Sequence, residues 1–280
     1  MISAYGEQNL TIVGEKDSVI DGMNCYDPEG EEHFRGPHGI FFSSCNNIRL
    51  QGYTICKTGN FMHQLDNCTD VVLERVTALA GHDGIHLHMC RNVKIADCCF
   101  HTGDDCIAGC NVHNLTVSGC DLNTSCNVFR LGGHNILIEN NIIKGPGEYP
   151  HRLSMVRQGI LEFDQSDGRH NTLSLIEFFA SKHFAGRGQT SDIILRNCYV
   201  KGVDRLLHYE YDNIGCLHAG MELERIAFEN MKVEDLLRPS LVRGNAERPV
   251  QIVLLNVKAS FRNGQDLPLF DAQNVILTEE

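Results

Sequence analysis

Residues 71–120 decide the fold, and they read VVLERVTALA GHDGIHLHMC RNVKIADCCF HTGDDCIAGC NVHNLTVSGC. Short apolar runs recur in this stretch at Val71-Val72-Leu73, Val93-Lys94-Ile95 and Leu115-Thr116-Val117. These runs begin 22 residues apart. One coil of this length cannot bury its apolar face alone, so a fixed period indicates coils that stack and share a core.

The repeat continues in both directions along the chain. From position 48 to position 136 the runs begin 21 to 23 residues apart, whereas 57 residues separate the runs at 136 and 193, which predicts an insertion there. Within the repeat, a second set of positions follows five residues after the first apolar residue, and a third follows fourteen residues after it. The further runs are Leu10-Thr11-Ile12-Val13, Ile48-Arg49-Leu50, Ile136-Leu137-Ile138, Ile193-Ile194-Leu195, Ile226-Ala227-Phe228, Ile252-Val253-Leu254 and Val275-Ile276-Leu277; the second set includes Tyr53, Val76, Cys98 and Cys120, and the third Met62, Ile85, Ile107 and Phe129.

Three strand signals per repeat predict an all-β protein, a single-stranded right-handed parallel β-helix with about 22 residues per coil. We expect one domain over residues 1–280 with a lateral insertion at about 149–190, in which Thr172 to Phe184 packs beside the coils. A leucine-rich repeat has a similar period, but the chain lacks the Leu-x-x-Leu-x-Leu frame of that architecture.

Composition narrows the class of partner. The formal net charge of −12 argues against nucleic acid, since phosphate binding needs a basic face, yet it permits an anionic sugar polymer in a locally basic groove. No run of eighteen apolar residues predicts a membrane span. The N-terminus shows no secretory signal, so we expect a cytoplasmic protein whose 13 cysteines are mostly reduced core residues.

Acidic residues occupy matching positions on neighbouring coils. Asp83 follows Val71 by twelve residues, and Asp105 follows Val93 by twelve, with Asp104 directly before it. Stacking would place these backbones about 4.8 Å apart. Carboxylates this close repel, so the pKa of at least one should rise, which suits an acid that protonates a glycosidic oxygen while another carboxylate activates water. Taken alone, each motif is also an ordinary turn sequence.

A row of bases is predicted beside these acids. Three residues after each position of the acid ladder come His63, His86, Ala108 and Arg130, and Arg152 would extend the row. We expect these side chains to point outward and contact substrate. The candidate substrate-binding residues are His63, His82, His86, Asn127, Arg130 and Arg152, and the candidate catalytic residues are Asp83, Asp104 and Asp105.

The chain resembles the polygalacturonases of glycoside hydrolase family 28 over residues 9 to 155. The similarity lies in Asp83-Gly84-Ile85, in His101-Thr102-Gly103-Asp104-Asp105-Cys106-Ile107-Ala108 and in Arg35-Gly36-Pro37-His38-Gly39-Ile40. The resemblance implies that Asp104 is the general acid, that Asp83 and Asp105 hold and activate water, that hydrolysis proceeds with inversion, and that no metal or cofactor is required.

Three positions depart from the family pattern. The family's Asn-Thr before the first aspartate is Gly81-His82 here, and its Gly-His-Gly falls near Ser125-Cys126-Asn127, which lacks the histidine. Its Arg-Ile-Lys aligns with Arg152-Leu153-Ser154, which keeps only the arginine. The expectation is therefore a glycoside hydrolase acting on a carbohydrate, with uronic-acid-containing polymers among the candidate substrates.

Two alternatives remain open from the sequence. One is an elimination enzyme on the same scaffold, in which the three aspartates hold Ca²⁺ and Arg130 or Arg152 abstracts a proton. The other is a catalytically decayed carbohydrate-binding β-helix, which the missing histidine and lysine favour. The sequence gives no indication of oligomeric state.

Overall fold

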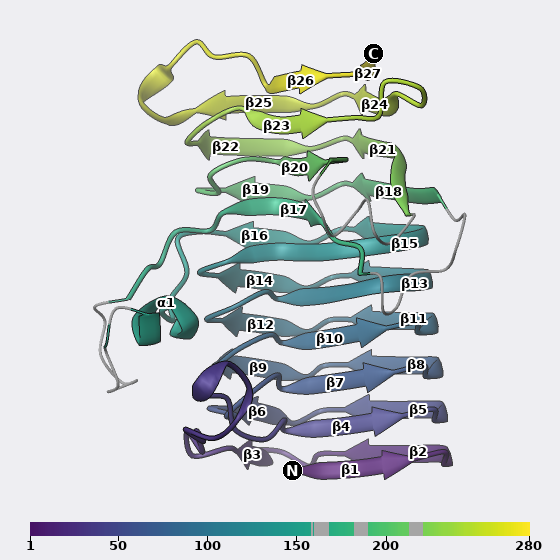
Figure 1. Ribbon diagram of the computed structural model, residues 1–280, viewed down its shortest axis with the longest axis vertical. Helices are drawn as coiled ribbons and strands as arrows, with labels where there is room; N and C mark the ends of the chain where they lie inside the picture. The colour runs from purple at the N-terminus through teal and green to yellow at the C-terminus, as the bar shows by residue number, and fades with distance from the viewer. Residues whose placement is uncertain (158, 160–167, 182–189, 213–220) are drawn as a thin grey trace.

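The computed structural model describes residues 1–157, 159, 168–181, 190–212 and 221–280. In these ranges the chain winds into coils stacked along one axis, with the N-terminus at one end and the C-terminus at the other (Figure 1). Neighbouring coils pair through parallel strands. The predicted right-handed parallel β-helix is therefore confirmed.

Each regular coil has three faces. The first two faces belong to one continuous sheet because β13 and β15 each run through both, and the third face is a separate sheet. The first face contains β1 (Ile2–Tyr5), β4 (Ile40–Ser43), β7 (His63–Asp66), β10 (Ile85–His88), β13 (Ile107–Ser118), β15 (Asn127–Glu139), β17 (Ser174–Phe178), β20 (Leu207–Glu210), β23 (Ser240–Arg243) and β26 (Phe270–Gln273). The second face contains β2 (Gln8–Val13), β5 (Asn46–Gln51), β8 (Thr69–Glu74), β11 (Arg91–Ala96), the later parts of β13 and β15, β18 (Thr190–Arg196), β21 (Glu222–Glu229), β24 (Val250–Leu255) and β27 (Val275–Glu279). The third face contains β3 (Val19–Asp21), β6 (Thr54–Cys56), β9 (Thr77–Ala80), β12 (Cys99–Thr102), β14 (Asp121–Thr124), β16 (Ile142–Lys144), β19 (Tyr199–Lys201), β22 (Lys232–Leu236) and β25 (Lys258–Phe261).

The apolar runs of the sequence form columns along the second face. Val71 pairs with Ile48 on one side and with Val93 on the other, and the column continues through Leu115 and Ile136. These side chains are buried inside the coils. Because side chains alternate along a strand, the residues between them point to solvent, and the buried residues of successive coils form one continuous column of the core.

Two predicted alignments are wrong by small register shifts. His63, not Met62, shares the column of Ile85, because His86 pairs with Gln64. At the last coil Ile252 pairs with Leu277 rather than with Val275. A coil length that varies by a residue or two cannot be read from apolar spacing alone, because a neighbouring apolar residue satisfies the pattern equally well.

Asparagines at the corners help to hold the coils in register. Asn92, Asn114 and Asn135 each have φ between 55° and 57°, a left-handed conformation that asparagine tolerates better than most residues. The amide of Asn114 donates to Asn92 and that of Asn135 to Asn114, each at 2.9 Å. The corner therefore forms a hydrogen-bonded ladder along the stack.

Two segments stand beside the coils on the same side of the stack (Figure 1). One precedes β4 and contains the 3₁₀ turn η1 (Glu31–His33), and the other follows β16 and contains α1 (Arg152–Arg157). A second 3₁₀ turn, η2 (Arg262–Gly264), follows β25.

The predicted insertion at about 149–190 is only partly correct. Its first part does leave the stack, but Ser174–Phe178 is β17, which pairs with β15 and β20 inside the sheet. Leu175 and Ile176 are fully buried there, so the stretch from Thr172 belongs to a coil instead of packing beside one. Residues 158, 160–167 and 182–189 of the predicted insertion lie outside the described residues.

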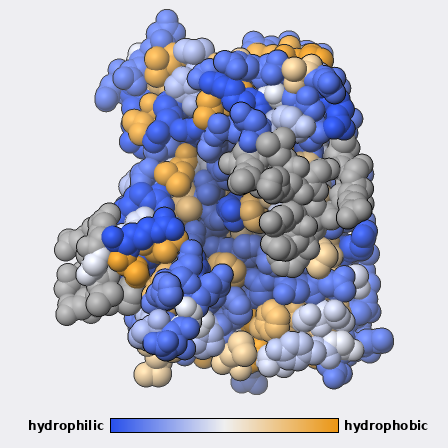
Figure 2. All heavy atoms as spheres, viewed as in Figure 1, coloured by the Kyte–Doolittle hydropathy of each residue, from blue (hydrophilic) through white to orange (hydrophobic). Residues whose placement is uncertain are grey.

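The surface in the view of Figure 1 is predominantly hydrophilic (Figure 2). Within the described residues no helix has the length and apolar character needed to cross a membrane. The cysteines in this part of the chain are free thiols, most of them buried, as expected for core residues.

Candidate active site

Three aspartates meet at the turns that lead from the third face into the first. Asp83 lies between β9 and β10, and Asp104 and Asp105 lie between β12 and β13. The pairing of Ile85 with Ile107 places Asp83 and Asp105 at the same position of adjacent coils. One carboxylate oxygen from each of the three residues lies within 4.8 Å of the other two. The predicted acid cluster therefore forms, although its members are buried, with Asp83, Asp104 and Asp105 only 2%, 9% and 3% exposed.

Asp104 lies between two nitrogen donors that come from outside the regular coils. Nη2 of Arg35, on the segment before β4, lies 3.7 Å from its Oδ2. Nε2 of His151, directly before α1, lies 3.5 Å from its Oδ1. The backbone carbonyl of Asp104 accepts hydrogen bonds from the hydroxyl groups of Thr102 and Thr124, which fixes the turn.

The other two aspartates are held by side chains of the coils. Oδ2 of Asp83 lies 2.7 Å from Nδ1 of His86. Oδ1 of Asp105 accepts hydrogen bonds from the backbone N–H of Asn127 at 3.0 Å and from its side-chain amide at 2.9 Å. Each carboxylate thus has a fixed orientation before any substrate binds.

The surroundings of the three acids separate their pKa values. Burial, and then the charges of Asp104 and Asp105, raise the pKa of Asp83 well above its usual range. Burial and the charge of Asp104 raise the pKa of Asp105 to about 6. Burial would also raise the pKa of Asp104, but the hydrogen bond from His151 and the charge of Arg35 outweigh it and lower that pKa below its ordinary value. In the resting protein Asp104 is therefore the ionised member, and a proton resides on the Asp83–Asp105 pair near neutral pH.

The same surroundings argue against the alternative in which the three aspartates hold Ca²⁺. Three carboxylates at this spacing are ligands that Ca²⁺ prefers. However, the guanidinium of Arg35 already faces one oxygen of Asp104 and the imidazole of His151 faces the other. A divalent cation there would be repelled by Arg35, so the residues present do not fit it, and no step is derived through a metal.

A polar network behind Asp104 was not anticipated. Nη1 of Arg35 lies 3.0 Å from Oδ1 of Asn60 and 3.1 Å from Nδ1 of His82. Its guanidinium carbon also lies 5.2 Å from the centre of the Phe61 ring. Arg35 and His151 are thus site residues that sequence reasoning missed. Arg35 lies in the stretch 35–40 that resembles the family, so the sequence did offer a signal for this residue. Nothing in the coil pattern points to His151.

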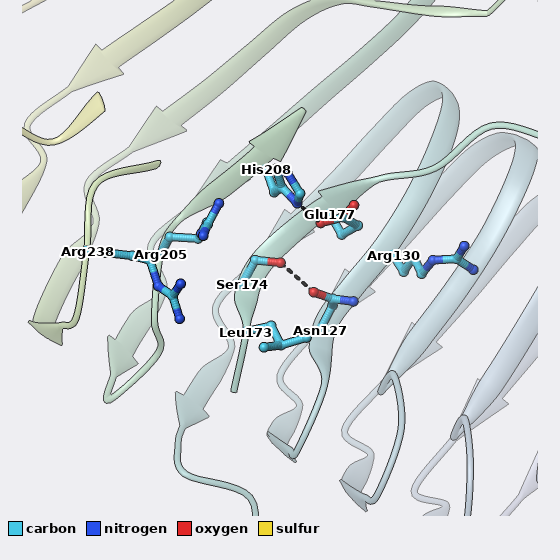
Figure 3. Close-up of a pocket in the computed structure, with 8 residues that line it drawn as sticks. All are labelled: Asn127, Arg130, Leu173, Ser174, Glu177, Arg205, His208 and Arg238. Carbon is cyan, nitrogen blue, oxygen red and sulfur yellow. Dashed lines mark hydrogen bonds and ion pairs between the residues drawn. The ribbon is translucent and has the colours of Figure 1, made fainter. Parts of the chain in front are cut away.

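A basic cavity of about 340 Å³ is lined by residues that follow the acid cluster along the chain. Figure 3 shows these lining residues. Asn127, which binds Asp105, also lines this cavity, so the two features are adjacent. Its other lining residues are Arg130, Leu173, Ser174, Glu177, Arg205, His208 and Arg238.

The charges in the cavity are only partly neutralised. Nδ1 of His208 lies 2.6 Å from Glu177, and this hydrogen bond is the main reason that the pKa of His208 is raised. Arg238 pairs with the buried Asp204. In the described ranges no carboxylate lies within ion-pair distance of Arg130 or Arg205, so these two guanidinium groups give the cavity positive charge in a protein of formal net charge −12.

The predicted row of outward bases is correct in part. His86, Ala108 and Arg130 do share a column, which continues through Glu177 and His208. The prediction for His63 is wrong. Its side chain is fully buried, with Nε2 2.8 Å from the hydroxyl of Tyr53 and Nδ1 2.7 Å from the carbonyl of Gly84, because the one-residue register shift turns it to the inner side of the coil.

Arg152 and His82 also lie elsewhere than predicted. Arg152 is in α1, not on the coil that follows Asn127, because that coil resumes at Ser174. It is 4% exposed and His82 is fully buried, so neither presents a free surface to a substrate. His86 and Asn127 are also buried, where they hold Asp83 and Asp105, whereas Arg130 is partly exposed and lines the cavity.

The chain is similar to known proteins in sequence and in structure. Residues 2–139 match the family described as Glycosyl hydrolases family 28. A probable polygalacturonase of Arabidopsis thaliana is 31% identical over 120 residues, which are 41% of this chain and 25% of that protein. The solved structure of a family 28 exopolygalacturonase from Yersinia enterocolitica covers 86% of this chain and 47% of its own, with a TM-score of 0.45 and 11% identity.

The chain thus spans about a quarter of the length of the curated relative and about half that of the structural one. The family match includes every residue of the acid cluster and ends before α1 and the later coils. Residues 2–139 match glycosyl hydrolases family 28, and over this part the chain is polygalacturonase-like.

Proposed function

We propose that this chain hydrolyses glycosidic bonds of an acidic, uronic-acid-containing polysaccharide. The observation that carries the proposal is the cluster of Asp83, Asp104 and Asp105, whose oxygens lie within 4.8 Å of one another. Paired carboxyl groups of different pKa are what glycoside hydrolysis needs, one to protonate the leaving oxygen and another to activate water. The family match and the names of its relatives support the same class of substrate.

The geometry supports the division of roles that the resemblance implies. Asp104 is the most exposed of the three, so it is the group that a glycosidic oxygen can approach. Asp83 and Asp105 lie deeper, and His86 and Asn127 orient them to hold the attacking water. Asp104 gives its proton to the leaving oxygen while water attacks the anomeric carbon and passes a proton to Asp83 or Asp105.

The resting charges agree with this cycle. A turnover that begins with the proton on Asp104 ends with Asp104 ionised and the proton on the Asp83–Asp105 pair, which is the distribution favoured by their pKa values. The next cycle then begins with proton transfer back to Asp104 over less than 4.8 Å. We propose inversion at the anomeric carbon, because two fixed carboxylates beside one another suit a bound water better than a single nucleophile.

The basic cavity supports an acidic substrate. Arg130 and Arg205 can pair with sugar carboxylates, and charge-assisted hydrogen bonds of this kind are among the strongest in proteins. Asn127 links the cavity to Asp105, so one polysaccharide bound along the stack places one sugar at the acids and a neighbouring sugar in the cavity.

Turnover of defined polymers tests the proposal. Polygalacturonate and an uncharged glucan are each incubated with the protein, with and without a calcium chelator. We expect new reducing ends from the acidic polymer only, unaffected by the chelator, and inverted anomeric configuration in the first product by ¹H NMR. An ultraviolet-absorbing, unsaturated product that needs calcium would instead establish elimination. Binding without turnover at any pH would establish a carbohydrate-binding protein.

A further inference from the structure

His151 reaches the acid cluster from a segment that leaves the regular coils. Its side chain is 9% exposed, and Nε2 lies 3.5 Å from Oδ1 of Asp104. Asp104, Cys126 and His151 bring a carboxylate oxygen, the thiol sulfur and a ring nitrogen within 4.8 Å of one another. Cys126 is the coil position at which the family resemblance would place a histidine. An imidazole is therefore present beside Asp104, although it comes from a different part of the chain.

The contacts of the ring determine where its proton lies. The backbone N–H of Ser154 donates to Nδ1 of His151 at 3.2 Å, so Nδ1 must carry a lone pair. The hydroxyl of Ser154 lies 2.6 Å from the same nitrogen, and Nε of Arg169 donates to that hydroxyl oxygen at 3.4 Å. A neutral imidazole with an accepting Nδ1 has its proton on Nε2. His151 therefore presents an N–H group to Asp104.

This assignment argues against a metal at the Asp104, Cys126 and His151 cluster. A metal would need the lone pair of Nε2, which would force the proton onto Nδ1 and against the N–H of Ser154. In addition, burial and the charges of Asp105 and Asp104 raise the pKa of the Cys126 thiol well above its usual value, whereas a metal ligand must be a thiolate. The arrangement fits a hydrogen bond to a carboxylate.

The backbone holds His151 in this position. The N–H of His151 donates to the carbonyl of Arg169 at 2.9 Å, which ties both ends of the excursion together. Gly103 allows the close approach, because a Cβ there would lie 2.5 Å from the carbonyl oxygen of Pro150. Met155 of α1 is fully buried and anchors the helix. The glycine directly before Asp104 thus leaves room for the segment that carries His151.

We propose that His151 is the positioning residue of Asp104: its Nε2–H orients the carboxyl group and stabilises the carboxylate that remains after proton donation, in place of a histidine on the coil. The inference rests on the proposed function, since the role concerns proton transfer by Asp104. Its chemistry requires no further reactant, because the same proton leaves Asp104 for the glycosidic oxygen and returns to it from the Asp83–Asp105 pair.

Substitution and relocation of the histidine test this role. In the full chain we expect His151→Ala to lower kcat on polygalacturonate at least tenfold with less than a threefold change in KM. We expect the basic limb of the pH profile to move to higher pH, because the Asp104 carboxylate loses a stabilising donor. His151→Gln, which keeps an N–H donor, should recover part of the loss. His134→Ala, at an exposed position of β15, is the matched control and should change neither parameter.

A second arm separates this inference from the proposed function. The ¹³C resonance of the Asp104 carboxyl group is titrated in the wild type and in His151→Ala without substrate, with thermal melting to verify folding. An upward shift of the Asp104 midpoint supports the inference even if no polysaccharide is turned over. An unmoved midpoint in a folded His151→Ala, or an active His151→Ala with an unchanged pH profile, overturns it and leaves hydrolysis by the wild type standing. Recovery of activity in the double variant Cys126→His, His151→Ala would support the inference, because a histidine on the coil would then have replaced His151.

Discussion

The acid cluster and the basic cavity are adjacent, yet they are built in different ways. The acids occupy matching turns on two neighbouring coils, are almost completely buried, and are held by His86, Asn127, Arg35 and His151. The cavity lies along the first face, where one column changes from Ala108 to Arg130, then to Glu177 and to His208. The first arrangement fixes pKa values, whereas the second presents partly exposed charges. Under the proposed function, the acids perform the chemistry and the cavity recognises the substrate.

The division into these two regions also coincides with the extent of the family match. The match ends at residue 139, so it includes the acids but only Asn127 and Arg130 of the cavity. The remaining cavity residues come from later coils, which lie outside the matched residues. We therefore expect substitutions in the first region to affect mainly kcat and those in the second to affect mainly KM.

The largest effect is expected from removal of the proton donor. Asp104→Asn should lower kcat by about 10²- to 10⁴-fold, because an amide cannot protonate the leaving oxygen. Arg35 and His151 should keep their positions in this variant. Initial rates of reducing-end formation on polygalacturonate measure this. Asp121→Asn, an exposed aspartate of β14, is the control and should be fully active. Full activity of Asp104→Asn would remove this residue from the mechanism.

A smaller and different effect is expected in the cavity. Arg205→Ala should raise KM for polygalacturonate at least tenfold with little change in kcat, since a charge-assisted hydrogen bond contributes roughly 1.5–3 kcal/mol. Arg196→Ala is the control, because Arg196 pairs with Glu139 and does not line the cavity. A tenfold loss in kcat at constant KM would contradict the separation of chemistry from recognition.

The smallest effect is a gain in stability. The pKa of Asp105 is raised to about 6, so the folded state favours the protonated form, and this contribution to stability is lost as pH rises through 6. Asp105→Asn removes the cost of the buried charge and keeps an oxygen for Asn127. We expect the free energy of unfolding to rise by about 1 kcal/mol at pH 7.5 and by much less at pH 4.5.

Thermal or denaturant unfolding at the two pH values measures this gain. Asp271→Asn is the comparison, because Asp271 is exposed and its pKa is lowered by its hydrogen bond with Arg243. Its substitution should not stabilise the protein at either pH. A loss of stability in Asp105→Asn at pH 7.5 would mean that the negative charge of Asp105 is needed to hold Asn127 in place.

The sequence by itself determined the repeat and the position of the acids. An apolar run every 22 residues requires stacked coils, and equal spacing from that run places Asp83 beside Asp105. The same reasoning found the column of His86 and Arg130, because both lie in coils of nearly equal length. These are consequences of local periodicity, which a single sequence contains in full.

Only the tertiary structure decided which way His63 points, which residues form the coil after Asn127, and which side chains contact Asp104. A one-residue difference in coil length turns a side chain from the surface to the core, and apolar spacing does not resolve it. Arg35 and His151 reach Asp104 from segments that leave the repeat, so their positions depend on how those segments fold back and pack. Periodicity predicts which residues of a coil are buried and which positions match between coils. It does not predict where segments outside the coils lie.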